Sequence, residues 1–168
     1  ISWNSSFDDN GILIVGGREI HNHDNLAPGR VSLVDVFKMS LNVEASKISV
    51  GLGAERFYQC IRNFGFGALT RIELASEVAG DVKSVGDGRW HDIDLATNAF
   101  GQGIAVTPLQ LATAMAAVAN QGKLMRPHII QEIRLSNGTI IETKPEMVRQ
   151  VIRASTATQT TQLLTQSV

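Results

Sequence analysis

The alternation of apolar and polar residues along the chain predicts short hairpins and short helices. Four apolar residues, Ile12–Val15, come directly before Gly16-Gly17, and a second β-forming run follows over residues 18–20. Paired glycines between two such runs favour a two-residue hairpin turn, because these turns require positive φ angles. A second hairpin is expected over residues 129–142, with Asn137-Gly138 as its turn.

Helix-start signals place most of the expected helices. Ser32 followed by Asp35, and Thr107 followed by Pro108 and Gln110, both have the spacing of a capping box. We therefore expect a short helix after Ser32 and the clearest helix over residues 108–120, ending before Gly122. Further helices are expected over residues 43–50 and 54–63 and from about residue 157 with Thr156 and Gln159 as its caps, whereas residues 65–98 are expected to be mostly loop.

The helix at residues 108–120 is expected to be the best-buried element. Leu111, Met115 and Val118 recur at helical spacing and form one apolar stripe. Small alanines fill much of the remaining surface, which would allow another element to approach closely.

Composition narrows the class of protein without identifying it. The 168 residues are 43% hydrophobic and 18% charged, which suits a single folded domain. A formal charge of −1 argues against a nucleic-acid-binding protein, because phosphate binding normally brings a basic excess. The single cysteine, Cys60, excludes an internal disulfide. The longest apolar run is too short to span a bilayer, and no signal peptide is visible at the start.

Three polar clusters carry residue types that suit chemistry. His21-x-His23 with Asp24 suits a metal ion, His91 with Asp92 and Asp94 suits acid–base catalysis, and Gly101-Gln102-Gly103 ahead of a helix suits an anion. We favour a structural interpretation of each. The first lacks further ligands, the second has no demonstrated common cleft, and the third lacks both a third glycine at dinucleotide spacing and a following Gly-Lys-Ser/Thr.

The segment Ser40-Leu41-Asn42 falls where one expected short helix gives way to the next. Side chains at positions i and i+2 share a side only where the backbone is not helical. A hydroxyl and an amide brought together at such a junction could transfer a proton and hold a substrate carbonyl. On these residues alone, a local cap for the following helix explains the motif equally well.

A longer pattern contains this motif and resembles the transpeptidase domain of class B penicillin-binding proteins, the monofunctional D,D-transpeptidases. The resemblance covers about residues 27–168 and rests on segments in the family's order and at about its spacing: Ser40–Val43 (SLNV), 51–58 (GLGAERFY), 64–67 (FGFG), 96–112 (ATNAFGQGIAVTPLQLA), 116–122 (AAVANQG) and 126–127 (RP).

The resemblance implies an α+β fold that is mainly helical. The chain would form the central, largely helical part of the penicillin-binding protein and serine β-lactamase-like fold, with β-hairpins and without most of the main sheet. Residues 1–30 would be a lead-in segment with a hairpin. Residues 31–168 would be the central part of the transpeptidase domain, between the family's Ser-x-x-Lys and Lys-Thr/Ser-Gly motifs.

The resemblance also implies an activity, namely cross-linking of peptidoglycan stem peptides by serine acyl transfer, with β-lactams acylating the same serine. Ser40 would help to transfer a proton to the leaving group, and Asn42 would orient the substrate amide and the active-site lysine. No metal or organic cofactor is implied, and no nucleic acid. Stem peptides, β-lactams and other cell-wall synthesis proteins would be the partners. The location would be the outer face of the bacterial cell membrane, with the anchor outside this chain.

The family uses three motifs in chain order, and this chain contains only the middle one. No serine has a lysine three residues later, and no lysine begins Lys-Thr/Ser-Gly. Many relatives have Ser or Asp at the position of Leu41 and Gly at the position of Glu44. These two departures leave the hydroxyl and the amide in place, but they change their surroundings and bear on substrate preference.

We therefore expect a fragment of a longer enzyme that is inactive by itself and, having lost its sheet, prone to non-native oligomerisation through exposed apolar surface. Two alternatives remain open. One is a non-catalytic relative that serves as a scaffold or cell-wall binding module, and the other is a β-lactam sensor or β-lactamase of the same superfamily.

Overall fold

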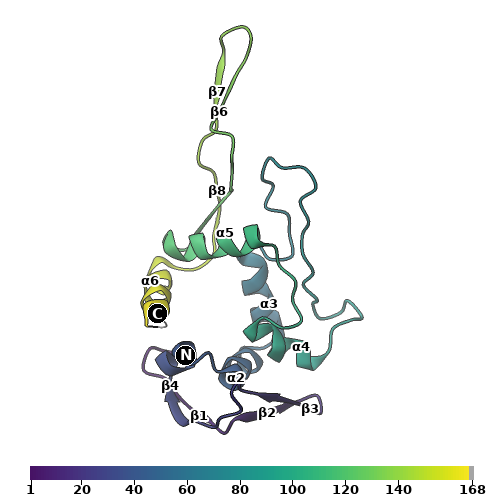
Figure 1. The fold of residues 1–168 in the computed structure, drawn as a ribbon, viewed down its shortest axis with the longest axis vertical. Helices are drawn as coiled ribbons and strands as arrows, with labels where there is room; N and C mark the ends of the chain where they lie inside the picture. The colour runs from purple at the N-terminus through teal and green to yellow at the C-terminus, as the bar shows by residue number, and fades with distance from the viewer. Residues whose placement is uncertain (167–168) are drawn as a thin grey trace. The chain divides into compact units, whose positions relative to one another are not determined.

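The computed structural model describes residues 1–166, and it confirms the α+β class with more helix than strand (Figure 1). Every sheet in this range has two antiparallel strands. The helices are α1 (Leu33–Lys38), α2 (Asn42–Leu52), α3 (Ala54–Asn63), α4 (Asp92–Thr97), the 3-10 turn η1 (Asn98–Phe100), α5 (Pro108–Ala119) and α6 (Ala154–Thr165). The strand pairs are β1 (Ser6–Asp9) with β4 (Gly29–Ser32), β2 (Ile12–Val15) with β3 (Arg18–His21), β5 (Lys123–Met125) with β8 (Met147–Gln150), and β6 (Glu132–Arg134) with β7 (Ile140–Glu142).

The chain folds into two compact units, and the boundary between them runs through α3 and α6. The first unit contains residues 1–60, 82–105 and the described residues from 159 onward. The second contains residues 61–81 and 106–158. The boundary expected at residue 30, between the lead-in segment and the central part of the domain, does not coincide with this division and stays a prediction.

In the first unit, α2 packs against α4 and against the β2–β3 hairpin (Figure 1). The expected hairpin and the capping box of Ser32 and Asp35 are both present. Val31, Val36 and Leu41 form an apolar cluster, and Phe7 and Ile48 pack against it. This cluster ties the strand pair β1–β4 to the two helices that flank Ser40.

Helix α4 lies in the stretch 65–98 that we expected to be mostly loop, so that prediction is wrong for residues 92–98. Hydroxyl groups, rather than an apolar stripe, join α4 to α2. Ser46 donates to the carbonyl of Ala96 at 3.1 Å, and Ser49 donates to the carbonyl of Leu95 at 2.9 Å. A contact of this kind leaves no hydrophobic periodicity in the sequence for a helix prediction to detect.

Helix α5 has the expected bounds and capping box, but its buried face was predicted wrongly. Leu111 and Met115 are about half exposed, whereas Gln110, Ala114 and Ala117 are buried together with Val118. The Gln110 amide donates to the carbonyls of Ala68 and Ala79 at 2.7 and 2.8 Å, and these bonds orient the helix. The buried face of α5 is therefore set by Gln110, whose amide is fully hydrogen-bonded, and not by the apolar stripe.

Helix α6 starts at Ala154, earlier than expected, so Thr156 and Gln159 lie inside the helix and do not cap it. The first helical bond runs from the Ala157 amide to the Arg153 carbonyl at 2.9 Å.

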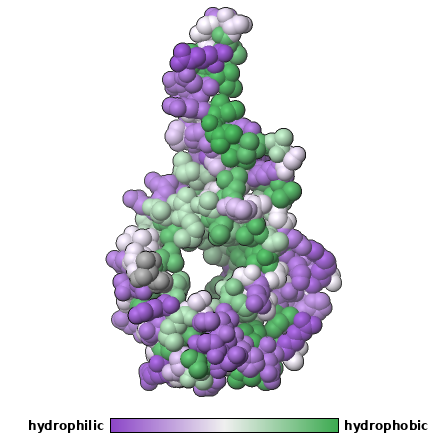
Figure 2. All heavy atoms as spheres, viewed as in Figure 1, coloured by the Kyte–Doolittle hydropathy of each residue, from purple (hydrophilic) through white to green (hydrophobic). Residues whose placement is uncertain are grey.

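The β6–β7 hairpin in the second unit carries an exposed apolar face. Ile133 is paired with Ile141 across the two strands, and they are 46% and 50% exposed. Leu135 follows Ile133 on the same face and is also exposed. Figure 2 shows hydrophobic residues along one side of this hairpin and hydrophilic residues along the other.

We expect a polypeptide of these 168 residues to self-associate through this face, because burial of two isoleucines is worth several kcal/mol. Replacing both Ile133 and Ile141 with threonine keeps the β propensity and should weaken association of two copies roughly 10⁴-fold, about tenfold for each of the four side chains replaced in the pair. Sedimentation velocity over a concentration series measures the effect. The matched control replaces Glu132 and Glu142, the pair on the opposite face, with threonine and should associate like the wild type. A wild-type chain that is monomeric at all concentrations would contradict the prediction.

Candidate functional site at the Ser40–Asn42 turn

Ser40 occupies a left-handed backbone position at the end of α1. Its φ angle is +52°, a value that residues other than glycine rarely adopt. The Ser40 amide donates to the Phe37 carbonyl at 3.3 Å, and the Leu41 amide donates to the Val36 carbonyl at 3.1 Å. These two bonds form a Schellman motif, in which this position is usually glycine. Leu41 completes the motif by packing against Val36.

The fold alone therefore favours glycine at the position where the chain has serine. A strained residue is retained only where its surroundings enforce it, and such residues cluster at functional sites. The Ser40 side chain is exposed, and within residues 1–166 its hydroxyl has no hydrogen-bond partner. The hydroxyl is thus available to donate or accept a proton.

Asn42 is the first residue of α2 and is half-buried. Its Nδ2 donates to the backbone carbonyl of His21, at the end of β3, at 3.2 Å. The structure therefore excludes Asn42 as the cap of α2, since an N-cap precedes the first helical residue; Leu41 holds that position and makes no side-chain cap. One hydroxyl and one amide thus lie two residues apart where α1 gives way to α2, and both groups can donate or accept hydrogen bonds.

Behind the turn, a buried ion pair links α2 to β1. Glu44 is fully buried, and Lys47 donates to its Oε1 and to the carbonyl of Asp8, both at 2.6 Å. The second carboxylate oxygen of Glu44 has no partner among the described residues. Burial raises the pKa of Glu44, although the Lys47 ammonium opposes the shift. Glu44 and Lys47 also line an open pocket of about 590 Å³ with Phe7 and Ile48.

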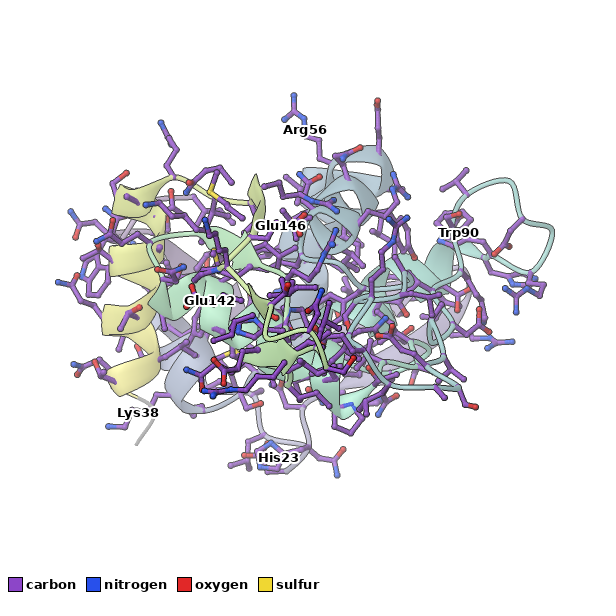
Figure 3. All side chains as sticks on the ribbon, turned by 90° about the horizontal axis from the view of Figure 1, so that it is seen from above. His23, Lys38, Arg56, Trp90, Glu142 and Glu146 are labelled. Carbon is purple, nitrogen blue, oxygen red and sulfur yellow. The ribbon has the colours of Figure 1, made fainter. Side chains whose placement is uncertain are left out.

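The His21, His23 and Asp24 side chains do not gather into a metal-binding group among the described residues. No group of three potential ligands that could hold a metal occurs within residues 1–166. His21 pairs with Glu19 at 3.2 Å. His23 extends away from the protein at the outer end of its loop (Figure 3).

The His91, Asp92 and Asp94 cluster has a structural role. Asp94 accepts from the His91 backbone amide at 2.8 Å and so caps α4, and it pairs with the Lys83 ammonium at 3.0 Å. Burial acts to raise the pKa of Asp94, but these two donors outweigh it and leave the pKa below its usual value. A carboxylate with fixed partners and a lowered pKa is suited to holding the segment, not to exchanging protons near neutral pH.

The Gly101-Gln102-Gly103 turn contributes tight packing. Gly103 has a φ angle of +81°, and a Cβ there would approach the Asn98 side chain to 3.0 Å. Asn98 in turn bonds the buried Tyr58 hydroxyl, which also accepts from the Trp90 indole at 2.8 Å. The glycines close a turn that carries this buried polar network, as the structural interpretation requires.

Within residues 1–166, no helix is both long and apolar enough to cross a membrane.

Comparisons with known proteins agree with the resemblance seen in the sequence. The sequence model of the penicillin binding protein transpeptidase domain matches residues 1–168. Stage V sporulation protein D of Bacillus subtilis is 32% identical over 155 residues, covering 91% of this chain and 24% of that protein. Peptidoglycan D,D-transpeptidase FtsI of Escherichia coli is 33% identical over 119 residues, covering 71% of this chain and 19% of that protein.

Among solved structures, penicillin-binding protein 3 of Mycobacterium tuberculosis, complexed with aztreonam, matches with a TM-score of 0.87 and 30% identity. The match covers 97% of this chain and 36% of that one. The chain spans about a quarter of the length of the curated relatives it matches. Since the family model covers the whole sequence and both the sequence and the structural likeness extend over most of it, the chain belongs to the penicillin-binding protein transpeptidase domain family.

Proposed function

We propose that these residues form the middle part of the catalytic domain of a class B penicillin-binding protein that cross-links peptidoglycan stem peptides. The observation that carries the proposal is Ser40, a serine kept in a strained position with an unpaired hydroxyl beside Asn42, within a chain of this family. Residues 31–168 would lie between the Ser-x-x-Lys and Lys-Thr/Ser-Gly motifs, which other parts of a longer protein would supply.

The reaction would proceed in two acyl transfers. The nucleophilic serine oxygen attacks the carbonyl of the penultimate D-alanine, the C–N bond to the terminal D-alanine breaks, and that D-alanine leaves as an amine after gaining a proton. An amine of a second stem peptide then attacks the ester, forms the new amide and returns the proton to the serine. Ser40 would relay the proton to the leaving group, and Asn42 would hold the substrate amide and the active-site lysine.

The same chemistry explains β-lactam binding, and structures of a relative complexed with aztreonam and with ampicillin support that part of the proposal. Neither acyl transfer calls for a metal or an organic cofactor. Because the substrate lies in the cell wall, the catalytic domain would act on the outer face of the cell membrane, held there by an anchor outside these residues. Other cell-wall synthesis proteins would be its partners.

Labelling with a fluorescent penicillin tests the proposal. The longer protein should acquire a covalent label, and prior incubation with ampicillin should abolish it. The 168-residue chain should remain unlabelled, because no serine in it has a lysine three residues later. A longer protein that folds but takes no label would favour a non-catalytic scaffold. A labelled 168-residue chain would contradict the assignment of the nucleophile to another part of the protein.

A further inference from the structure

We propose that Asn22, locked by the buried carboxylate of Asp9, is a positioning residue for the Ser40–Asn42 turn. The inference rests on the proposed function, because it assigns a role in the reaction of that turn. It also concerns the polar loop after β3, a segment for which the sequence offered only a metal site that we did not favour.

The first observation is that α2 lacks a cap of its own. Leu41 occupies the N-cap position, and its side chain cannot accept a hydrogen bond. The Val43 amide, in the first turn of α2, donates instead to Oδ1 of Asn22 at 3.2 Å. The start of the helix that carries Asn42 is therefore fixed by a side chain 21 residues earlier in the chain.

The second observation is that adjacent residues hold both sides of Asn42. The His21 carbonyl accepts from the Asn42 side chain, and the Asn22 side chain accepts from the next backbone amide, that of Val43. Any shift of the loop at residues 21–22 therefore moves the amide side chain and the helix start together.

The third observation is that Asn22 itself has no freedom to turn. Asn22 is 2% exposed, and its Nδ2 donates to Oδ2 of Asp9 at 2.9 Å and to the Leu26 carbonyl at 3.1 Å. Asp9 is fully buried, and its Oδ1 accepts from the Gly11 amide at 2.7 Å. Within residues 1–166, no cation forms a salt bridge with Asp9.

Burying a carboxylate without a cation costs free energy, so the presence of an aspartate at position 9 needs an explanation. An ionised carboxylate can only accept hydrogen bonds, whereas an amide can donate or accept. Asp9 and the Leu26 carbonyl both accept from Nδ2 of Asn22, and this leaves Oδ1 facing the Val43 amide. These two acceptors together select the one amide orientation that caps α2.

The test uses acylation of the longer protein by a fluorescent penicillin, followed in time at several concentrations. We expect Asn22→Ala to lower the acylation rate constant about 10- to 100-fold, the size of effect caused by a displaced catalytic group. The affinity for penicillin before acylation should change little. The matched control is Tyr58→Phe, which removes buried hydrogen bonds in the same unit but makes no contact with the turn, and which should acylate like the wild type.

A charge swap separates positioning from mere stability. Asp9→Asn alone leaves only the Leu26 carbonyl to fix the amide orientation at residue 22, and Asn22→Asp alone sets two carboxylates against each other, so both should acylate more slowly than the wild type. The double variant Asp9→Asn/Asn22→Asp restores a donor at residue 9 and an acceptor for Val43 at residue 22. Its rate should recover most of the loss, the signature of two coupled residues, although a carboxylate at residue 22 cannot donate to the Leu26 carbonyl.

Each result has a definite meaning. If the wild-type protein takes no label, the proposed function fails and the inference fails with it. If the wild type is labelled and Asn22→Ala is labelled equally fast, only the inference is overturned. The inference is also overturned if the double variant folds and stays as slow as the single variants.

Discussion

The variant Ser40→Gly should be more stable than the wild type by about 0.5–1 kcal/mol and yet acylate about 100-fold more slowly in the longer protein. The gain in stability arises because the left-handed conformation costs an L-residue roughly 1–2 kcal/mol, a cost that glycine does not bear. Glycine is also freer in the unfolded chain, and this opposing effect cancels about 0.4–1 kcal/mol of the gain. The loss of rate arises because a proton-transferring group contributes about 10²–10⁴-fold. Urea unfolding and fluorescent-penicillin labelling measure the two effects.

Ser40→Ala is the matched control for this variant. It also removes the hydroxyl, but it keeps a Cβ in the left-handed region and should therefore show the slow acylation without the gain in stability. If Ser40→Gly acylates at the wild-type rate, Ser40 serves only to end α1. The opposite signs of the two effects in one variant make this a sharp test, since a damaged fold cannot produce them.

Elements coded by neighbouring residues could be predicted from the sequence. The capping box of Ser32 and Asp35, the paired glycines of the first hairpin and the bounds of α3 all follow from side chains that act within four residues of one another. The family resemblance also emerged from short motifs in order, and the comparisons confirm it.

Elements fixed by distant polar contacts could not be predicted. Helix α4 is held by the hydroxyls of Ser46 and Ser49, and the buried face of α5 is set by the amide of Gln110. Asn22 caps a helix that starts 20 residues further on, and its nearest sequence neighbours gave no signal for a cap of that helix. In each case a fully bonded polar group replaces the apolar pattern on which a reading of the sequence depends.

The turn itself lies between these two cases. Its residues, Ser40 and Asn42, were singled out from the motif, and the structure places both at the junction of α1 and α2 as expected. The left-handed backbone of Ser40 had no signal in the sequence, because serine does not mark that conformation as glycine would. The strained backbone of Ser40 is therefore visible only in the structure.

The substitution Lys47→Met should lower the free energy of unfolding by roughly 2–3 kcal/mol at pH 7. Removing one member of a buried ion pair costs about 3–5 kcal/mol, because it leaves a buried charge uncompensated. The effect here is smaller because Lys47 is 32% exposed, whereas its partner Glu44 is only 1% exposed. Lys47 donates the one hydrogen bond recorded to the Glu44 carboxylate within the described residues, so the variant leaves both oxygens without a partner.

The loss should shrink as the pH falls towards 4.5, and the direction follows from the raised pKa of Glu44. A carboxyl whose pKa is higher in the folded state favours folding when protonated, below its unfolded pKa of 4.5, and this advantage is lost as the pH rises through its folded value. Burial raises that value, and loss of the Lys47 ammonium raises it further. As the pH falls, protonation of Glu44 therefore removes the uncompensated charge from the Lys47→Met variant. Over the same pH range the wild type gains less stability, because its Glu44 is still paired with Lys47.

Urea unfolding of the 168-residue chain at pH 7 and pH 4.5 measures both effects. The double variant Glu44→Met/Lys47→Met removes both charges and should recover most of the stability, since an apolar pair of similar volume commonly replaces a buried ion pair without loss. Lys38→Met removes an exposed ammonium at the end of α1 (Figure 3) and should stay within about 0.5 kcal/mol of the wild type. If Lys47→Met also stays within about 0.5 kcal/mol of the wild type at pH 7, the buried Glu44 side chain beside the turn is not ionised at that pH, and the prediction is wrong.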